Sequence, residues 1–154
     1  MNKKLLSISI IFFVFLLDRF FKYLILTHIP EGGGFAVIPN VFHITRVNNS
    51  GAAFGMLRGY GTILVAISAL FIAFLIFYLF RRGRDGKASS EFLSEAAWSL
   101  MIGGAAGNLF DRLRYGYVVD FLDFRVWPVF NLADASICLG VFFVVWGLWK
   151  QRKN

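Results

Sequence analysis

The amino-acid sequence predicts an all-α membrane protein with four transmembrane helices and both termini cytoplasmic, plus a small β-rich extracytoplasmic subdomain between helices 1 and 2. Composition, four apolar segments and the distribution of charge support this prediction. Of the 154 residues, 58% are hydrophobic and 18% are aromatic, and the mean hydropathy is +0.66. A soluble domain is roughly half apolar, so this excess indicates lipid surroundings. The length fits a single domain over residues 1–154.

Four apolar segments are the candidate membrane-spanning helices. The hydrocarbon core of a bilayer is about 30 Å thick, and roughly 20 helical residues cross it. The segments are residues 5–26, 62–80, 96–110 and 133–149. The third is short, so flanking residues must complete its span. The first follows two lysines, as a secretory signal does, but it meets charged residues where a small-residue cleavage site would stand. It is therefore interpreted as an uncleaved helix.

The net charge of +7 is explained by topology. In a four-span arrangement, Lys3 and Lys4, the turn "RRGRDGK" and the basic C-terminal residues all fall on one side. The positive-inside rule places that side, with both termini, in the cytoplasm. Because the excess positive charge follows the topology, no nucleic-acid partner is expected.

The segment between the first two spans, residues 28–60, is expected to form the outer β-rich loop. Pro30 and the Gly32–Gly34 run indicate a turn, and "FAVI" and "VFHITRV" have the branched and aromatic content of strands. We expect a small sheet on the outer surface. "GAAFGML", residues 51–57, is expected to form a short helix with Asn49 or Ser50 as its cap.

Polar residues gather at the outer ends of the predicted helices. Asp18 and Lys22 are four residues apart, so they share a helix face and can neutralise each other near the interface. Gly103 and Gly107 have the GxxxG spacing that permits close approach between membrane helices. The next turn carries a further polar group, which is interpreted as scaffold built around an Asp–Arg pair: Asn108, Asp111 and Arg112.

Asp120 and Asp134 are the candidates for chemistry. Asp120 follows two valines, and Asp134 lies one helical turn after Asn131, on the same face, at the start of the fourth span. Acids in such positions are costly and usually mark function. Two carboxylates in a low dielectric do not both ionise easily, so one keeps a proton. Such a pair suits acid–base activation of water against a peptide carbonyl, while a proton or cation pathway remains the alternative.

Metal or cofactor chemistry is not expected. Cys138 is the only cysteine and lies inside an apolar run, which favours a packing role. His28 and His43 are isolated, and the sequence has no metal-ligand spacing.

Five blocks, in order along nearly the whole chain, resemble the signature blocks of lipoprotein signal peptidase, also called signal peptidase II. They are "DRFFK" (18–22), "NNSGAAFG" (48–55), "GGAAGNLFDR" (103–112), "VVDF" (118–121) and "FNLADASI" (130–137). The resemblance implies an aspartic endopeptidase, multi-pass in the bacterial cytoplasmic (inner) membrane, with its active site near the extracytoplasmic face. It implies diacylglyceryl prolipoprotein substrates, cut just before the lipidated cysteine.

By the same resemblance, Asp120 and Asp134 are the catalytic pair. The resemblance also implies a set of substrate-binding or site-supporting residues: Asp18, Lys22, Asn49, Gly51, Asn108, Asp111, Arg112 and Asn131. Phe54 and Met56 in the outer loop are expected to offer surface to acyl chains. The expected partners are the prolipoprotein substrates and membrane lipid, and the protein is expected to be a monomer without a cofactor.

The competing interpretation is a small proton-coupled membrane transporter, which would also need intramembrane acids. A transporter predicts polar residues distributed along the spans. The middles of the second and fourth spans contain only Ser68 and Cys138 as polar positions. A non-enzymatic membrane adaptor would not need Asp120 and Asp134. The sequence therefore favours the peptidase.

Overall fold

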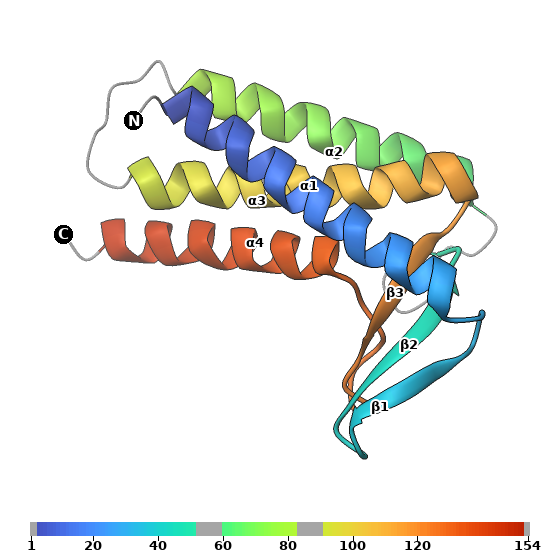
Figure 1. The fold of residues 1–154 in the computed structure, drawn as a ribbon. Coiled ribbons are helices and arrows are strands. Elements are labelled where there is room, and N and C mark those ends of the chain that lie inside the picture. The colour runs from blue at the N-terminus through green and yellow to red at the C-terminus, as the bar shows by residue number, and fades with distance from the viewer. Residues whose placement is uncertain (1–2, 52–59, 83–90, 153–154) are drawn as a thin grey trace.

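The computed structural model describes residues 3–51, 60–82 and 91–152, and within these ranges the chain is mostly helical with one small sheet (Figure 1). The elements in chain order are α1 (Lys3–His28), β1 (Gly34–Ile38), β2 (Phe42–Asn49), α2 (Gly61–Arg82), α3 (Glu91–Tyr115), β3 (Val118–Asp123) and α4 (Leu132–Gln151). The helices form a bundle, and the sheet extends from one end of it. In Figure 1, α1 begins and α4 ends at the opposite end of the bundle from the sheet.

Two helices in the described ranges are long and apolar enough to cross a membrane. They are the Gly61–Leu79 part of α2, with hydropathy 2.7, and the Leu132–Lys150 part of α4, with hydropathy 1.8. Only 11% of either stretch is buried inside the protein, so both differ from the core helix of a soluble domain. α1 and α3 carry more polar and charged residues, many of which face the bundle. The four-span topology remains a prediction.

α3 is the central helix and packs against the other three. Close packing depends on its glycines, because a Cβ added at Gly103 would lie 2.9 Å from the Ile11 carbonyl oxygen on α1. A Cβ at Gly104 would meet the Ala133 carbonyl oxygen on α4, and one at Gly107 would lie 2.6 Å from Oδ2 of Asp18. The GxxxG packing prediction is therefore confirmed, with α1 as the helix that Gly103 and Gly107 approach.

The three strands form an antiparallel sheet in the order β1-β2-β3. β1 and β2 confirm the two strands expected in the outer loop. The sequence did not predict β3. In the β2–β3 register, Val47 lies opposite Asp120 and Asn49 lies opposite Val118. The sheet packs on the end of α1 through a small apolar cluster: Ile25, Ile29, Val119 and Phe121.

The helix expected over residues 51–57 and its apolar side chains Phe54 and Met56 fall, apart from Gly51, outside the described residues.

Candidate active site

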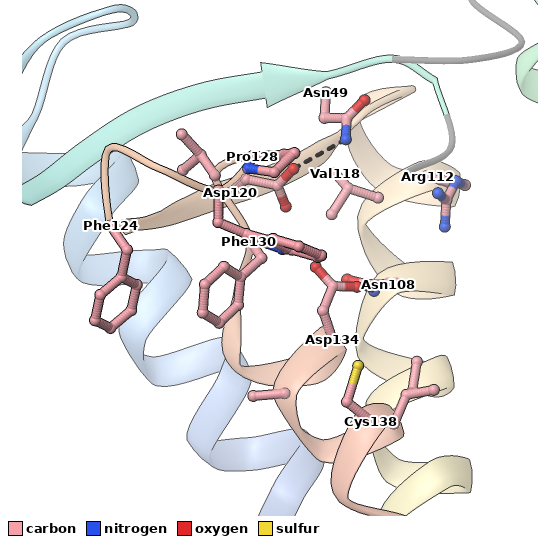
Figure 2. A pocket seen from close by; sticks show the side chains of 14 residues that line it. Asn49, Asn108, Arg112, Val118, Asp120, Phe124, Pro128, Phe130, Asp134 and Cys138 are labelled. Atoms are coloured by element: carbon pink, nitrogen blue, oxygen red, sulfur yellow. Dashed lines mark hydrogen bonds between the residues drawn. The ribbon is translucent and has the colours of Figure 1, made fainter. Parts of the chain in front are cut away.

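Asp120 and Asp134 point into the same pocket, one from β3 and the other from the first turn of α4 (Figure 2). The pocket has a volume of about 610 Å³. Its polar wall consists of Asn49, Asn108, Arg112, Asp120 and Asp134. Its apolar wall consists mainly of Phe124, Trp127, Pro128, Val129 and Phe130, from the segment between β3 and α4. The pocket thus combines a carboxylate pair with an apolar surface.

Asn131 connects the two aspartates. It is fully buried and caps the N-terminus of α4, where its Oδ1 accepts a hydrogen bond from the Asp134 backbone N–H at 2.9 Å. Its own backbone N–H donates to Oδ2 of Asp134 at 3.2 Å, which completes a capping box. Its Nδ2 donates to Oδ1 of Asp120 at 2.7 Å. The sequence predicted a shared helix face for Asn131 and Asp134; the structure instead joins them through the cap.

Two further asparagines donate to the two carboxylate oxygens that Asn131 does not bind. Nδ2 of Asn49, at the end of β2, donates to Oδ2 of Asp120 at 2.9 Å (Figure 2). Nδ2 of Asn108, on α3, donates to Oδ1 of Asp134 at 2.7 Å. Each of the four carboxylate oxygens therefore accepts one hydrogen bond. A carboxylate oxygen has two lone pairs, so each keeps acceptor capacity for a water or a substrate.

The environment of Asp120 favours its protonated form. Burial, followed by the charge of Asp134, raises the pKa of Asp120 from 3.8 to about 7. The hydrogen bonds from Asn49 and Asn131 and the charge of Lys22 act in the opposite direction and are too weak to cancel the increase. Near neutral pH this carboxyl can both hold and release a proton.

Arg112 and Gly51 lie at the rim of the site. Nη2 of Arg112 donates to the Gly51 carbonyl oxygen at 3.3 Å, and the Gly51 N–H donates to Oδ1 of Asn49 at 3.0 Å. This chain of contacts orients the amide of Asn49 so that its Nδ2 faces Asp120. The predicted Asp111–Arg112 pair is wrong, because Asp111 is bound by Arg19 and Lys22 instead. Adjacent residues on a helix point in different directions.

A buried ion cluster lies behind the pocket, and we define it by four residues: Asp18, Arg19, Lys22 and Asp111. The predicted Asp18–Lys22 pair is confirmed, with Nζ 3.0 Å from Oδ2. Nζ of Lys22 also donates to Oδ1 of Asn108 at 3.0 Å, which connects the cluster to the site. Arg19 was not singled out from the sequence. The available signal was its charge inside an apolar helix, which requires a partner.

One other expectation changes with the structure. Cys138 was interpreted as a packing residue, but it is exposed and lines the pocket one helical turn after Asp134. Asp123 on β3 accepts a hydrogen bond from Thr45, pairs with Arg125 and does not line the pocket. Among residues 3–51, 60–82 and 91–152, no group of three His, Cys, Asp or Glu side chains could hold a metal ion.

The comparisons with known proteins agree on one family. Residues 10–150 match the family model described as signal peptidase (SPase) II. The chain is 42% identical over 144 residues to a lipoprotein signal peptidase of Halothermothrix orenii, covering 94% of this chain and 95% of that protein. It is 44% identical over 135 residues to a lipoprotein signal peptidase of Moorella thermoacetica, covering 88% and 87%.

A solved structure described as a bacterial membrane enzyme has a TM-score of 0.86 with this chain at 36% identity, covering 96% of this chain and 90% of that one. A second, also described as a bacterial membrane enzyme, has a TM-score of 0.79, again at 36% identity, covering 92% and 91%. With the two apolar helices, these similarities support a membrane location. They favour the peptidase over the transporter. The chain belongs to the signal peptidase II family.

Proposed function

We propose that this chain is a membrane-embedded aspartic endopeptidase that removes the signal peptide from diacylglyceryl-modified prolipoproteins, cutting just before the lipidated cysteine. The observation that carries the proposal is that Asn131 donates hydrogen bonds to both carboxylates, which line the same pocket. A volume of about 610 Å³ lies within the usual range of ligand-binding pockets. Membership of the signal peptidase II family supports the substrate class.

Asp134 is the proposed general base and Asp120 the proposed general acid. Asp134 lies at the N-terminus of α4, where the backbone N–H groups and the helix dipole stabilise negative charge. Asp120 is 3% exposed and has the raised pKa described above, which favours it as the carboxyl that holds the proton at the start of the reaction. Both roles require one proton shared by the pair at the start of the reaction.

The reaction proceeds in two steps in this proposal. Asp134 takes a proton from a water whose oxygen attacks the scissile carbonyl carbon, while Asp120 donates its proton to the carbonyl oxygen. In the second step, Asp134 donates its newly gained proton to the leaving nitrogen of the cysteine. Asp120 recovers a proton from the intermediate as the C–N bond breaks. Both carboxyl groups return to their starting states.

The proposed membrane arrangement has four spans in one domain, with both termini cytoplasmic and the site near the outer face of the inner membrane. The exposed apolar side chains of α2 and α4, such as Leu70 at 71% exposure, support lipid contact. The pocket lies at the end of α4 that joins the sheet, so a bond near the membrane surface could reach it while acyl chains stay in lipid. A monomer would suffice, since one chain supplies both aspartates.

The test is direct. Purified protein in detergent is mixed with a diacylglyceryl prolipopeptide, and the products are followed by mass spectrometry. The expected product begins with the lipidated cysteine. Absence of cleavage by well-folded protein, or cleavage at another bond, would contradict the proposal.

A further inference from the structure

The ion cluster holds the backbone next to both proposed catalytic aspartates. Oδ1 of Asp18 accepts a hydrogen bond from the Ala133 N–H at 3.1 Å, one residue before Asp134. Oδ2 of Asp111 accepts from the Val119 N–H at 3.2 Å, one residue before Asp120. Asp18 and Asp111 therefore serve as two anchors, one for each reactive side chain.

Two cations join the anchors to each other. Arg19 places Nη1 2.5 Å from Oδ1 of Asp111 and Nη2 2.8 Å from Oδ2 of Asp18. Nζ of Lys22 lies 2.7 Å from Oδ2 of Asp111 and 3.0 Å from Oδ2 of Asp18. The cluster is neutral overall, with two cations and two anions. Both carboxylates are fully buried, so each depends on these partners.

The Arg19 side chain is largely buried and packs against an aromatic ring. Its guanidinium lies over the Phe110 ring, with Cζ 4.8 Å from the centroid, and only 16% of its side chain is exposed. Its Nε is buried and has no hydrogen-bond partner within the part of the chain that the structure describes. The two terminal nitrogens of the planar guanidinium thus bind one carboxylate each. A single lysine amine would connect the same two carboxylates less rigidly.

We propose that Arg19 is a positioning residue that, together with Lys22, sets the relative position of Asp120 and Asp134 through Asp18 and Asp111. The proposal rests on the proposed function. Arg19 does not line the pocket, so it acts through the anchors and not on the substrate. Without it, two buried carboxylates share one amine, repel each other and allow β3 to shift relative to α4.

The test compares Arg19→Gln with wild type on a diacylglyceryl prolipopeptide. A displacement of about 1 Å between reacting groups can cost roughly a hundredfold in rate, so kcat should fall at least tenfold while KM changes less than about twofold. Arg114→Gln is the matched control, because Arg114 is exposed on the last turn of α3 at the same end of the bundle. The control should keep wild-type kcat.

The pH dependence of kcat/KM separates positioning from general stability. The charged groups around Asp120 are Asp134 on α4, Lys22 on α1 and Arg112 on α3. If the carboxylates move apart, Asp134 raises the pKa of Asp120 less, and the alkaline fall in rate moves to lower pH. Loss of the Arg19 charge by itself would move it to higher pH. A shift to higher pH, or an unchanged profile with a rate loss equal to the loss of folded protein, would overturn the proposal.

Arg19→Lys keeps the experiment decisive if Arg19→Gln does not fold. The lysine keeps the charge but not the fork, so we expect folded protein with kcat between the wild-type and glutamine values and the same direction of pH shift. If Arg19→Lys has the wild-type kcat and the wild-type pH profile, the two-nitrogen guanidinium contact is not required and the proposal is overturned. Wild-type and Arg114→Gln activity report separately on the proposed function, because that proposal fails if neither protein cleaves the lipopeptide.

Discussion

Asn131 donates from Nδ2 to Oδ1 of Asp120 across 2.7 Å, although one residue caps α4 and the other lies on β3. The same asparagine is hydrogen-bonded to both the backbone and the side chain of Asp134. A single buried amide thereby relates the sheet to the helix. The geometry of the carboxylate pair is set by this cap as well as by the ion cluster behind it.

Substitution of either aspartate should remove turnover. Asp120→Asn and Asp134→Asn keep the shape of the side chain but cannot exchange the proton, so kcat should fall by at least roughly 10² to 10⁴. Both variants should still fold, and lipopeptide binding should stay near wild type. Substantial cleavage by either purified variant would exclude the proposed roles.

Asn131→Ala should reduce activity more than stability. Loss of a helix cap costs about 1 kcal/mol in the free energy of unfolding, which a modest decrease in Tm would report. The loss of alignment between Asp120 and Asp134 should reduce kcat by about a hundredfold. Asn48→Ala is the matched control, because the Asn48 side chain accepts from Arg46 and does not line the pocket. Equal activity in the two variants would contradict the aligning role of Asn131.

The activity should fall on the alkaline side of neutrality. Because burial and the charge of Asp134 raise the pKa of Asp120 to about 7, kcat/KM should decrease about tenfold per pH unit above that value. The apparent pKa belongs to the coupled pair. A rate that stays constant up to pH 9 would show that a protonated Asp120 is not required.

The same shift predicts a pH dependence of stability. The folded pKa of Asp120 lies above its ordinary value of 3.8, so its contribution is fully present below that pH and is lost as the pH rises through about 7. Asp120→Asn removes this dependence. The Tm of the variant relative to wild type should therefore rise between pH 4 and 7, as scanning calorimetry in one detergent can measure. A constant difference would place Asp120 in a less buried environment than described.

Chelation should leave the rate unchanged. The proposed chemistry uses two carboxyl groups and a water, and the sequence lacks metal-ligand spacing. Cleavage rates should agree with and without EDTA. A loss of activity that one divalent ion restores would require a different mechanism.

Removal of the substrate's lipid should greatly slow cleavage. Each buried methylene contributes roughly 0.8 kcal/mol, so two acyl chains could dominate binding. A peptide of the same sequence without its diacylglyceryl group should lose at least roughly a hundredfold in kcat/KM, measured in the same detergent. Equal values for both peptides would show that the substrate class is wrong.

The four helices and the first two strands could be predicted because each has a local signal. Apolar runs of sufficient length indicate the helices, and branched and aromatic residues after a Gly-rich turn indicate β1 and β2. β3 lacks such a signal. Five of its six residues are buried, so it shows no alternation of polar and apolar positions, and its pairing with β2 is a long-range contact.

Many of the residues that line or support the pocket could be named from the sequence, but not all of their contacts could. The separation of four residues along one helix was enough to predict the Asp18–Lys22 pair. The Arg19–Asp111 contact joins residues 92 positions apart, and no periodicity reports such a contact. The Asn131 cap was interpreted as a shared helix face because the same separation of three residues fits both arrangements.

The hydrogen bond from the Ala133 N–H to Asp18 has a consequence for biosynthesis. Its partners are 115 residues apart, so the first helix leaves the ribosome long before the last one. Until then, Asp18 can be neutralised locally by Lys22, its ion-pair partner on the same helix. The paired carboxylates come together only once α4 has joined the bundle. A nascent chain therefore has no assembled carboxylate pair until its last helix has been made.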